Sequence, residues 1–336
     1  MRLLLVRLGA FGDIVHTLPL AADLAAAGHR VHWAVEDRWR VLLDGNPAVH
    51  AVHALPRKRL RSGPPTARLR AWLGFVADLR RAQVDAAIDA QGLAKSALVA
   101  LASAAPLRLG HSLARAREGA WLVTHRRAEA TAEHVIDQQR ALAELVGAQR
   151  PGPWRFPLPA WADDRAAAMA WLGERRFDRP WLLNVGAGWP TKVWPVECHA
   201  ELLRRLAARG ERAVLAWGSA AERELAERAR AEAGYGEILP PTTIPELAGF
   251  IAAARIMVSG DTGPLHLALA LGTPAVGLFG PVPATRNGPR GAGYRTLQAA
   301  GAAWERRDVS KASVAAITAG QVVDAADAAC ADFGRA

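Results

Sequence analysis

Residues 3–8, LLLVRL, form a short apolar run that leads directly into the glycine-containing turn GAFGD at 9–13. A short apolar run that ends in turn residues is typical of a buried strand, and the Ala- and Leu-rich segment 13–27 that follows is typical of a helix. The same succession recurs at 181–186, WLLNVG, where a glycine turn leads to a helix expected from Pro195. A repeated succession of strand, tight turn and helix predicts an α/β fold with parallel strands.

The rest of the chain continues this alternation. Further strands are expected at 31–35, 51–55, 85–89, 213–217, 255–259 and 274–279, and further helices at 68–81, 95–104 and 313–333 and from Ala220 and Thr262. Between the two halves, residues 151–160, PGPWRFPLPA, hold four prolines, which disfavour both helices and strand ladders. We therefore expect two Rossmann-like, doubly wound domains at 1–150 and 151–336, with the last helix packing back on the first domain.

The positive charge of the chain is concentrated in its first half. Arginine supplies 38 of the 42 basic residues, and the formal net charge is +10. Residues 1–150 hold 21 basic and 13 acidic residues, residues 151–336 hold 21 and 19, and the segment 57–81 holds eight and one. The hydrophobic share of 51% excludes a disordered polycation, and the two distant cysteines exclude a disulfide framework. No apolar run is long enough to span a membrane, and Arg7 within the first run argues against a secretory signal.

The first glycine turn places an acid at the start of a helix. A dinucleotide-binding turn has the spacing GxGxxG, whereas Gly9, Gly12 and Asp13 give GxxGD. A carboxylate at this position repels a phosphate and suits a proton-accepting role. The alternative is that Asp13 only caps its helix, and the spacing by itself favours that alternative.

The turn after 181–186 carries a lysine. Gly186, Ala187 and Gly188 follow or end the expected strand, and Lys192, one of only four lysines, precedes the next helix. A turn of small residues with a cation near a helix start suits a phosphate group. The alternative is a solvated loop lysine, and the spacing does not separate the two.

A third turn groups four residue types that bind or react. Asp261, Thr262, Gly263 and His266 follow the strand at 255–259 and open a helix. The first amides of a helix are free to bind an anion, and His266 lies one turn in, on the same face as the acid. A lone histidine is more often a core residue, but the combination favours a binding site.

The basic segment is the fourth candidate. Arg57, Lys58, Arg59 and Arg61 are followed by further arginines and two aromatic residues within 68–81. Clustered arginine binds phosphates and carboxylates in a bidentate manner. The alternatives are a solvated face and a track for nucleic acid, although no nucleic-acid-binding motif accompanies the segment. A non-catalytic protein that binds anions therefore stays open at this point.

Several catalytic signatures are absent from the sequence. No two of its sixteen aspartates are separated by a single residue, so there is no DxD metal motif, and there is no P-loop, HExxH or GxSxG pattern. We therefore expect no protein-bound metal and no other cofactor. A diphosphate bound here would be neutralised by Lys192 and by helix dipoles.

Four stretches together resemble the glycosyltransferase family 9 heptosyltransferases. They are LLLVRLGAFGDIVHTLP (3–19), DAAIDAQGLAKSA (85–97), TKVWP (191–195) and SGDTGPLHLALALGTPAVGLFGP (259–281), and the resemblance runs over nearly the whole chain. The second stretch is similar to the branch that adds the first heptose. The resemblance implies a GT-B fold, in which two Rossmann-like domains face a central cleft that holds the active site. One departure is at Ala187 and Gly188, where the pattern has hydroxyl residues.

The resemblance also implies an activity and its residues. It implies inverting transfer of L-glycero-D-manno-heptose from ADP-heptose to a Kdo residue of Kdo-lipid A, with Asp13 as the general base. The implied donor-binding residues are Gly186, Ala187, Gly188, Lys192, Glu222, Asp261, Thr262, Gly263 and His266, and the implied acceptor-binding residues are Gly12, Arg57, Lys58, Arg59, Arg61 and Arg117. The protein would act in the cytoplasm, on the anionic inner face of the inner membrane, without nucleic acid. The alternative within the family is another nucleotide sugar or another acceptor.

Overall fold

The computed structural model describes residues 1–129, 131–150, 152–300, 304–310 and 313–334. Its contacts divide the chain into two compact units, Met1–Ala160 and Trp161–Ala336. The predicted α/β class with two doubly wound sheets is confirmed, but the first unit ends at residue 160 and not at 150. The proline-rich stretch stays with the first unit because Trp154 Nε1 donates to Asp137 Oδ1 over 2.8 Å and Asn46 Nδ2 donates to the carbonyl of Pro157 over 2.7 Å.

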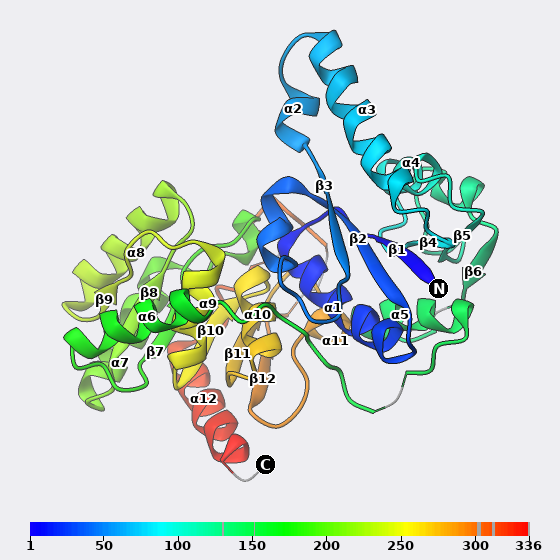
Figure 1. Ribbon diagram of the computed structural model, residues 1–336. Helices are drawn as coiled ribbons and strands as arrows, with labels where there is room; N and C mark the ends of the chain where they lie inside the picture. Colours follow the sequence, from blue (N-terminus) through cyan, green and yellow to red (C-terminus); the bar gives the residue numbers. More distant parts are fainter. Residues whose placement is uncertain (130, 151, 301–303, 311–312, 335–336) are drawn as a thin grey trace. The chain divides into compact units, whose positions relative to one another are not determined.

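The first unit is built on a six-stranded parallel sheet (Figure 1). Its strands are β1 (Arg2–Val6), β2 (Arg30–Glu36), β3 (Ala51–Leu55), β4 (Ala86–Asp89), β5 (Leu107–His111) and β6 (Arg126–Ala128). Its helices are α1 (Phe11–Ala26), α2 (Arg57–Arg61), α3 (Pro65–Arg81), α4 (Ala94–Ala102) and α5 (Val135–Arg140), with 3-10 turns η1 (Asp37–Leu42), η2 (Ala120–Val123) and η3 (Ala141–Val146).

The second unit is built on another six-stranded parallel sheet. Its strands are β7 (Trp181–Asn184), β8 (Ala213–Ala216), β9 (Glu237–Ile238), β10 (Ile256–Gly260), β11 (Ala275–Phe279) and β12 (Tyr294–Gln298). Its helices are α6 (Ala162–Glu174), α7 (Val196–Ala208), α8 (Ala220–Ala233), α9 (Ile244–Ala253), α10 (Gly263–Leu271), α11 (Ala284–Asn287) and α12 (Ala319–Phe333), with the 3-10 turn η4 (Pro190–Lys192).

Both sheets have the same strand order. The first runs β3-β2-β1-β4-β5-β6, and the second, read from its other edge, runs β9-β8-β7-β10-β11-β12. In each unit the chain therefore starts in the middle of the sheet, moves to one edge and then returns to fill the other side. Ligands of such sheets bind at the carboxyl ends of the strands where the order reverses. These switch points are β1 with β4 and β7 with β10.

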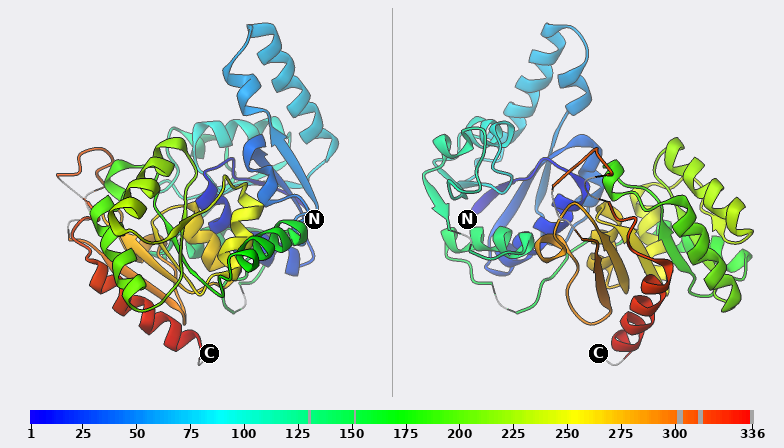
Figure 2. Two further views of the ribbon diagram at one scale, coloured as in Figure 1. Left: turned by 90° about the vertical axis from the view of Figure 1, so that its left-hand side faces the viewer. Right: turned by 180° about the vertical axis from the view of Figure 1, so that it is seen from behind.

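Helices cover both faces of each sheet. In the first unit, two different groups of helices cover the two faces. Right-handed crossovers place α1 on one face, where it packs with α5, and α3 and α4 on the other, where they pack with each other. Phe75 and Leu79 of α3 and Val99 of α4 join one buried cluster with residues of β1, β3 and β4. Figure 2 shows α3 extending past the sheet of this unit.

The last helix packs on the core of the second unit. α12 lies against α7 and against strands β10, β11 and β12. Val322, Ala326 and Ala329 are fully buried there and belong to the core cluster of the second unit. The helix also starts at Ala319, later than the expected Ser313, because Thr318 and Gln321 form a capping box.

Candidate active site

A buried ion pair lies at the switch point of the second sheet. Lys192 Nζ, from η4, is 2.5 Å from Asp261 Oδ2, which follows β10, and it also donates to the Asp261 carbonyl over 3.3 Å. The two side chains are 12% and 5% exposed. Gly260 allows the two segments to approach, because a Cβ there would lie 2.9 Å from the carbonyl oxygen of Lys192.

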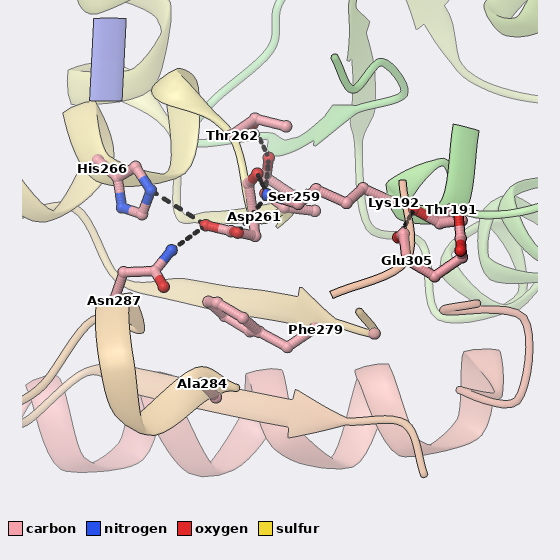
Figure 3. A network of polar contacts seen from close by, with 12 residues as sticks. Thr191, Lys192, Ser259, Asp261, Thr262, His266, Phe279, Ala284, Asn287 and Glu305 are labelled. Carbon is pink, nitrogen blue, oxygen red and sulfur yellow. Dashed lines mark hydrogen bonds and ion pairs between the residues drawn. The ribbon is translucent and has the colours of Figure 1, made fainter. Parts of the chain in front are cut away.

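The second carboxylate oxygen of Asp261 is also engaged (Figure 3). His266 Nε2 lies 3.2 Å from Oδ1, and Asn287 Nδ2, at the end of α11, donates to the same oxygen over 2.5 Å. Burial by itself raises the pKa of Asp261, but the hydrogen bond and charge of His266, with those of Lys192, outweigh it and lower the pKa to about 2. Asp261 is thus a permanent anion that holds three side chains in place.

Hydroxyl and amide groups join β7 to the start of α10. Asn184 Nδ2 donates to the carbonyl of Gly186 over 2.9 Å and to Ser259 Oγ over 3.1 Å, and Ser259 Oγ lies 3.0 Å from Thr262 Oγ1. Because the Thr262 hydroxyl is turned toward Ser259, it does not cap its own helix. The amide of Gly263 in the first turn has no intrahelical acceptor and can bind an anion.

Glu222 lies beside the same strand ends but outside this network. It is in the first turn of α8, and its Oε2 accepts the amide of Gly218 over 2.7 Å. A Cβ on Gly186 would lie 2.1 Å from the Glu222 carboxyl carbon, so a larger residue there would displace this carboxylate from its present position.

Further groups lie around Lys192 in the loop between β7 and α7. The centre of the Trp189 ring lies 4.2 Å from the Lys192 ammonium and 4.6 Å from the Arg306 guanidinium. Thr191 is fully buried and donates to the carbonyl of Glu305 over 2.9 Å. Of the expected residues on this loop, Ala187 is partly exposed and Gly188 is exposed, which leaves their backbone accessible to a ligand.

In the first unit, Asp13 lies at the switch point between β1 and β4. It is the third residue of α1, and its Oδ2 accepts the amide of Ala10 over 3.2 Å and pairs with Arg7 over 2.6 Å. Arg7 is 9% exposed in its side chain and also donates to the carbonyl of Ala90 over 2.8 Å, whereas Asp13 is 44% exposed. The capping interpretation is thus correct in part, and the carboxylate is also held by a buried arginine and open to solvent.

The carboxyl end of β4 supports one expected acceptor residue. Asp89 Oδ1 accepts the amide of Gly92 over 2.9 Å, and Gly92 accepts the amide of Arg117 through its carbonyl, also over 2.9 Å. A Cβ on Gly92 would lie 3.4 Å from the backbone of Ala116, and Gly92 has a φ of +68°. The bond to Gly92 holds the backbone of Arg117 close to the switch point, and the Arg117 residue is exposed there.

The basic segment forms α2 and contacts a buried acid. Glu36, 6% exposed at the end of β2, pairs with Arg57 over 3.2 Å, with Arg38 over 2.9 Å and with Lys95 over 3.5 Å. The other expected basic residues of α2, which are Lys58, Arg59 and Arg61, are exposed. Arg57 is thus partly neutralised, while its neighbours present their charge to solvent.

Several of these partners are not among the residues that the sequence patterns indicate. Arg7 directly follows β1 within an apolar run of the sequence and Glu36 ends β2; a buried charge requires a partner, so these positions are a signal that the sequence offers. Asn287 and Asn184 carry no such signal, because each acts through a long-range contact. No group of three or more His, Cys, Asp or Glu in the described ranges could hold a metal ion.

Comparison with known proteins agrees with this architecture. The chain matches the family model for glycosyltransferase family 9 (heptosyltransferase) over residues 72–315. It is 36% identical to lipopolysaccharide heptosyltransferase 1 of Pseudomonas aeruginosa, over 84% of this chain and 79% of that protein. It is 32% identical to lipopolysaccharide heptosyltransferase 1 of Escherichia coli, over 84% of this chain and 88% of that protein.

A solved structure with a donor analogue has the same fold. The E. coli heptosyltransferase WaaC with ADP-2-deoxy-2-fluoro heptose aligns with a TM-score of 0.76 and 29% identity, covering 96% of this chain and 98% of that chain. The predicted GT-B class is thereby confirmed. The two Rossmann-type sheets, the match to the family model over most of the chain and the identity to these relatives together show that the protein belongs to glycosyltransferase family 9, the heptosyltransferases.

Proposed function

We propose that the protein transfers L-glycero-D-manno-heptose from ADP-heptose to a Kdo residue of Kdo-lipid A, in synthesis of the lipopolysaccharide inner core. The observation that carries the proposal is the buried network of Lys192, Asp261 and His266 at the switch point of the second sheet, beside the open first turn of α10. The names of the relatives and the ADP-heptose analogue in the WaaC structure support it.

The network suits a diphosphate. Asp261 would repel a phosphate if it stood alone, but Lys192 and His266 surround its two oxygens. The amide of Gly263 adds a donor at the positive end of the helix dipole. Glu222, an acceptor of hydrogen bonds beside Gly186 and Gly218, suits the ribose hydroxyls of the nucleotide.

Asp13 suits the role of general base. Its contacts with Arg7 and with the amide of Ala10 both involve Oδ2, so Oδ1 is available to accept a proton from the acceptor hydroxyl. The deprotonated oxygen then forms a bond to the anomeric carbon of heptose as the bond to the phosphate oxygen breaks, and ADP leaves with that electron pair. Attack opposite the leaving group inverts the anomeric centre. Lys192 stabilises the charge that develops on the diphosphate.

The acceptor residues suit an anionic lipid. Kdo-lipid A carries carboxylates and phosphates, and the exposed residues Lys58, Arg59, Arg61 and Arg117 supply cations at the carboxyl edge of the first sheet. A lipid acceptor places the enzyme on the cytoplasmic face of the inner membrane. We expect neither a bound metal nor a nucleic-acid partner.

Release of ADP tests this proposal. The protein is incubated with ADP-heptose and Kdo-lipid A in detergent, and ADP and the heptosylated product are measured. Asp13→Asn should lower kcat by about 10²–10⁴-fold with little change in the donor KM. The control is Asp44→Asn, which replaces an exposed aspartate of the same unit and should leave kcat unchanged. Absence of turnover by the wild type, or full activity of Asp13→Asn, would overturn the activity or the base assignment respectively.

A further inference from the structure

The outer face of one helix layer in the first unit exposes an unusual number of apolar side chains. Twelve large hydrophobic residues are exposed among the described residues, and half of them lie on only three elements, α3, α4 and η2. They are Leu69 (57% exposed), Leu73 (56%), Leu98 (53%), Leu101 (46%), Trp121 (36%) and Leu122 (70%).

These side chains belong to one continuous layer. α3 contacts α4, and α4 contacts η2. Leu98 and Leu101 lie on the side of α4 opposite the buried Val99 and Ala100, whereas Leu69 and Leu73 share a helical stripe with the buried Val76 and are exposed on the first turns of α3. Leu69 and Leu73 are spaced i,i+4, and Leu98 and Leu101 are spaced i,i+3, so each pair forms a contiguous apolar spot on its helix. α3 extends beyond the sheet in every view (Figures 1 and 2).

The same part of the chain carries the net positive charge. Residues 57–127 contain fourteen Lys and Arg and four Asp and Glu, a net of +10, which equals the net charge of the whole chain. The four acids are engaged within the unit. Asp89 is 1% exposed, Asp85 accepts the amide of Arg2, Asp78 pairs with His53, and Glu118 accepts the amide of Ala94.

We propose that the outer face of α3, α4 and η2 is the surface by which this enzyme docks on an anionic lipid bilayer. The leucines would enter the boundary between headgroups and acyl chains, and the surrounding arginines would contact lipid phosphates. This is how a membrane-surface helix binds, with apolar burial and attraction to anionic lipid acting together. Within the described residues, no helix has the length and apolarity needed to cross a membrane.

Nucleic acid fits this face less well, because single strands bind by stacking on aromatic side chains and five of its six exposed apolar residues are leucines.

The inference rests on the proposed function in one respect: an enzyme with a lipid acceptor must bind where that lipid is, at the bilayer surface. Vesicle binding is therefore measured without donor or acceptor. The probes are flotation with vesicles of phosphatidylcholine alone and with vesicles that contain 30% phosphatidylglycerol. The variants are Leu69→Gln/Leu73→Gln, Leu98→Gln/Leu101→Gln and Arg68→Gln/Arg70→Gln.

The matched controls lie in the second unit. Met169→Gln removes an apolar side chain that is 58% exposed on α6, and Arg228→Gln/Arg230→Gln removes two exposed charges from α8. Thermal melting of each variant shows that it remains folded. Release of ADP with a detergent-dispersed acceptor shows that the site is intact.

The wild type should float with the anionic vesicles and not with phosphatidylcholine. Each leucine pair should weaken this binding roughly tenfold, because each exposed leucine loses part of its transfer free energy. The arginine pair should weaken it at low salt and have little effect at high salt, and the controls should bind like the wild type. If wild-type protein does not float, or if the leucine variants float as well as the wild type, the docking surface is wrong. Turnover failing in the wild type while flotation depends on these leucines would overturn the activity and leave the surface standing.

Discussion

Replacing Asp261 by asparagine isolates the charge of the buried network. Asparagine keeps the shape of the side chain, so Asn287 and His266 retain a polar neighbour, but Lys192 loses the anion that lies 2.5 Å from its ammonium group. Because the lysine side chain is only 12% exposed, water cannot replace that anion completely. We expect lower stability and weaker donor binding.

The magnitude follows from the pKa of the carboxyl. The network lowers the pKa of Asp261 from 3.8 to about 2, and a pKa difference of one unit corresponds to about 1.4 kcal/mol. The charged carboxylate therefore stabilises the folded state by roughly 2 to 3 kcal/mol at neutral pH. Since the folded pKa lies below the unfolded one, this stabilisation is complete above about pH 5, falls to about half near pH 3 and disappears below about pH 2.

Urea unfolding from pH 8 to pH 3 measures this difference. The chain has two units, so the transition is followed by hydrogen exchange of peptides from β10 and α10, which report on the second unit alone. Asp261→Asn should be roughly 2 to 3 kcal/mol less stable than the wild type at pH 7, and the difference should shrink below pH 4.

An exposed ion pair is the control for this measurement. Asp327 pairs with Arg209 over 2.8 Å at the surface, and its side chain is 45% exposed. Asp327→Asn should cost at most about 1 kcal/mol. Equal stability of the wild type and Asp261→Asn at pH 7, or a difference that grows as the pH falls below 4, would refute the reasoning about the buried network.

Three further predictions concern the same unit. Gly186→Ala should raise the donor KM, because its Cβ would displace the Glu222 carboxyl group, and it should cost at most about 1 kcal/mol of stability because that carboxylate can move; in a Glu222→Ala background the same substitution should leave the donor KM nearly unchanged, and an equal effect on KM in both backgrounds would contradict this contact. Asn287→Asp should raise the donor KM and destabilise the fold more than Asn287→Ala, because it places a second carboxylate against Asp261 Oδ1; urea unfolding at pH 7 compares the two. Dialysis against EDTA should leave the rate of ADP release unchanged, and a loss restored by Mg²⁺ would show that a metal takes part.

The sequence predicts the strands at the centre of each sheet because burial leaves a strong pattern. The runs at 51–55 and 213–217 correspond to β3 and β8 to within one residue, and the acid turn, the lysine turn and the turn at Asp261 all lie at strand ends where ligands bind. Four strands are not predicted: β6 and β9 have only three and two residues, and β5 and β12 have polar residues within their runs, LRLGH and YRTLQ. Such segments gain their structure from a neighbouring strand and not from their own composition.

The candidate site is predictable where one segment supplies both position and chemistry. Asp261 and His266 lie five residues apart, and a helical turn alone brings them together. Asn287 reaches the same carboxylate from 26 residues away, and Asn184 reaches Ser259 from 75 residues away. No local pattern encodes such contacts, because the pairing of β7 with β10 brings Asn184 to Ser259, and the pairing of β10 with β11 brings the following α11 and its Asn287 to Asp261.

The two units use one topology for opposite chemistry. In each, the strand that begins the sheet ends at the switch point in a loop that leads to a helix, and an ion pair lies there. In the second unit the carboxylate of Asp261 is 5% exposed and holds a lysine that is 12% exposed, and under the proposed function this lysine faces a diphosphate. In the first unit the guanidinium of Arg7 is 9% exposed and holds an aspartate that is 44% exposed, and under the proposed function this aspartate accepts a proton. In the proposed mechanism, the charge of the more exposed partner of each pair therefore decides whether the strand end binds a leaving group or activates a nucleophile.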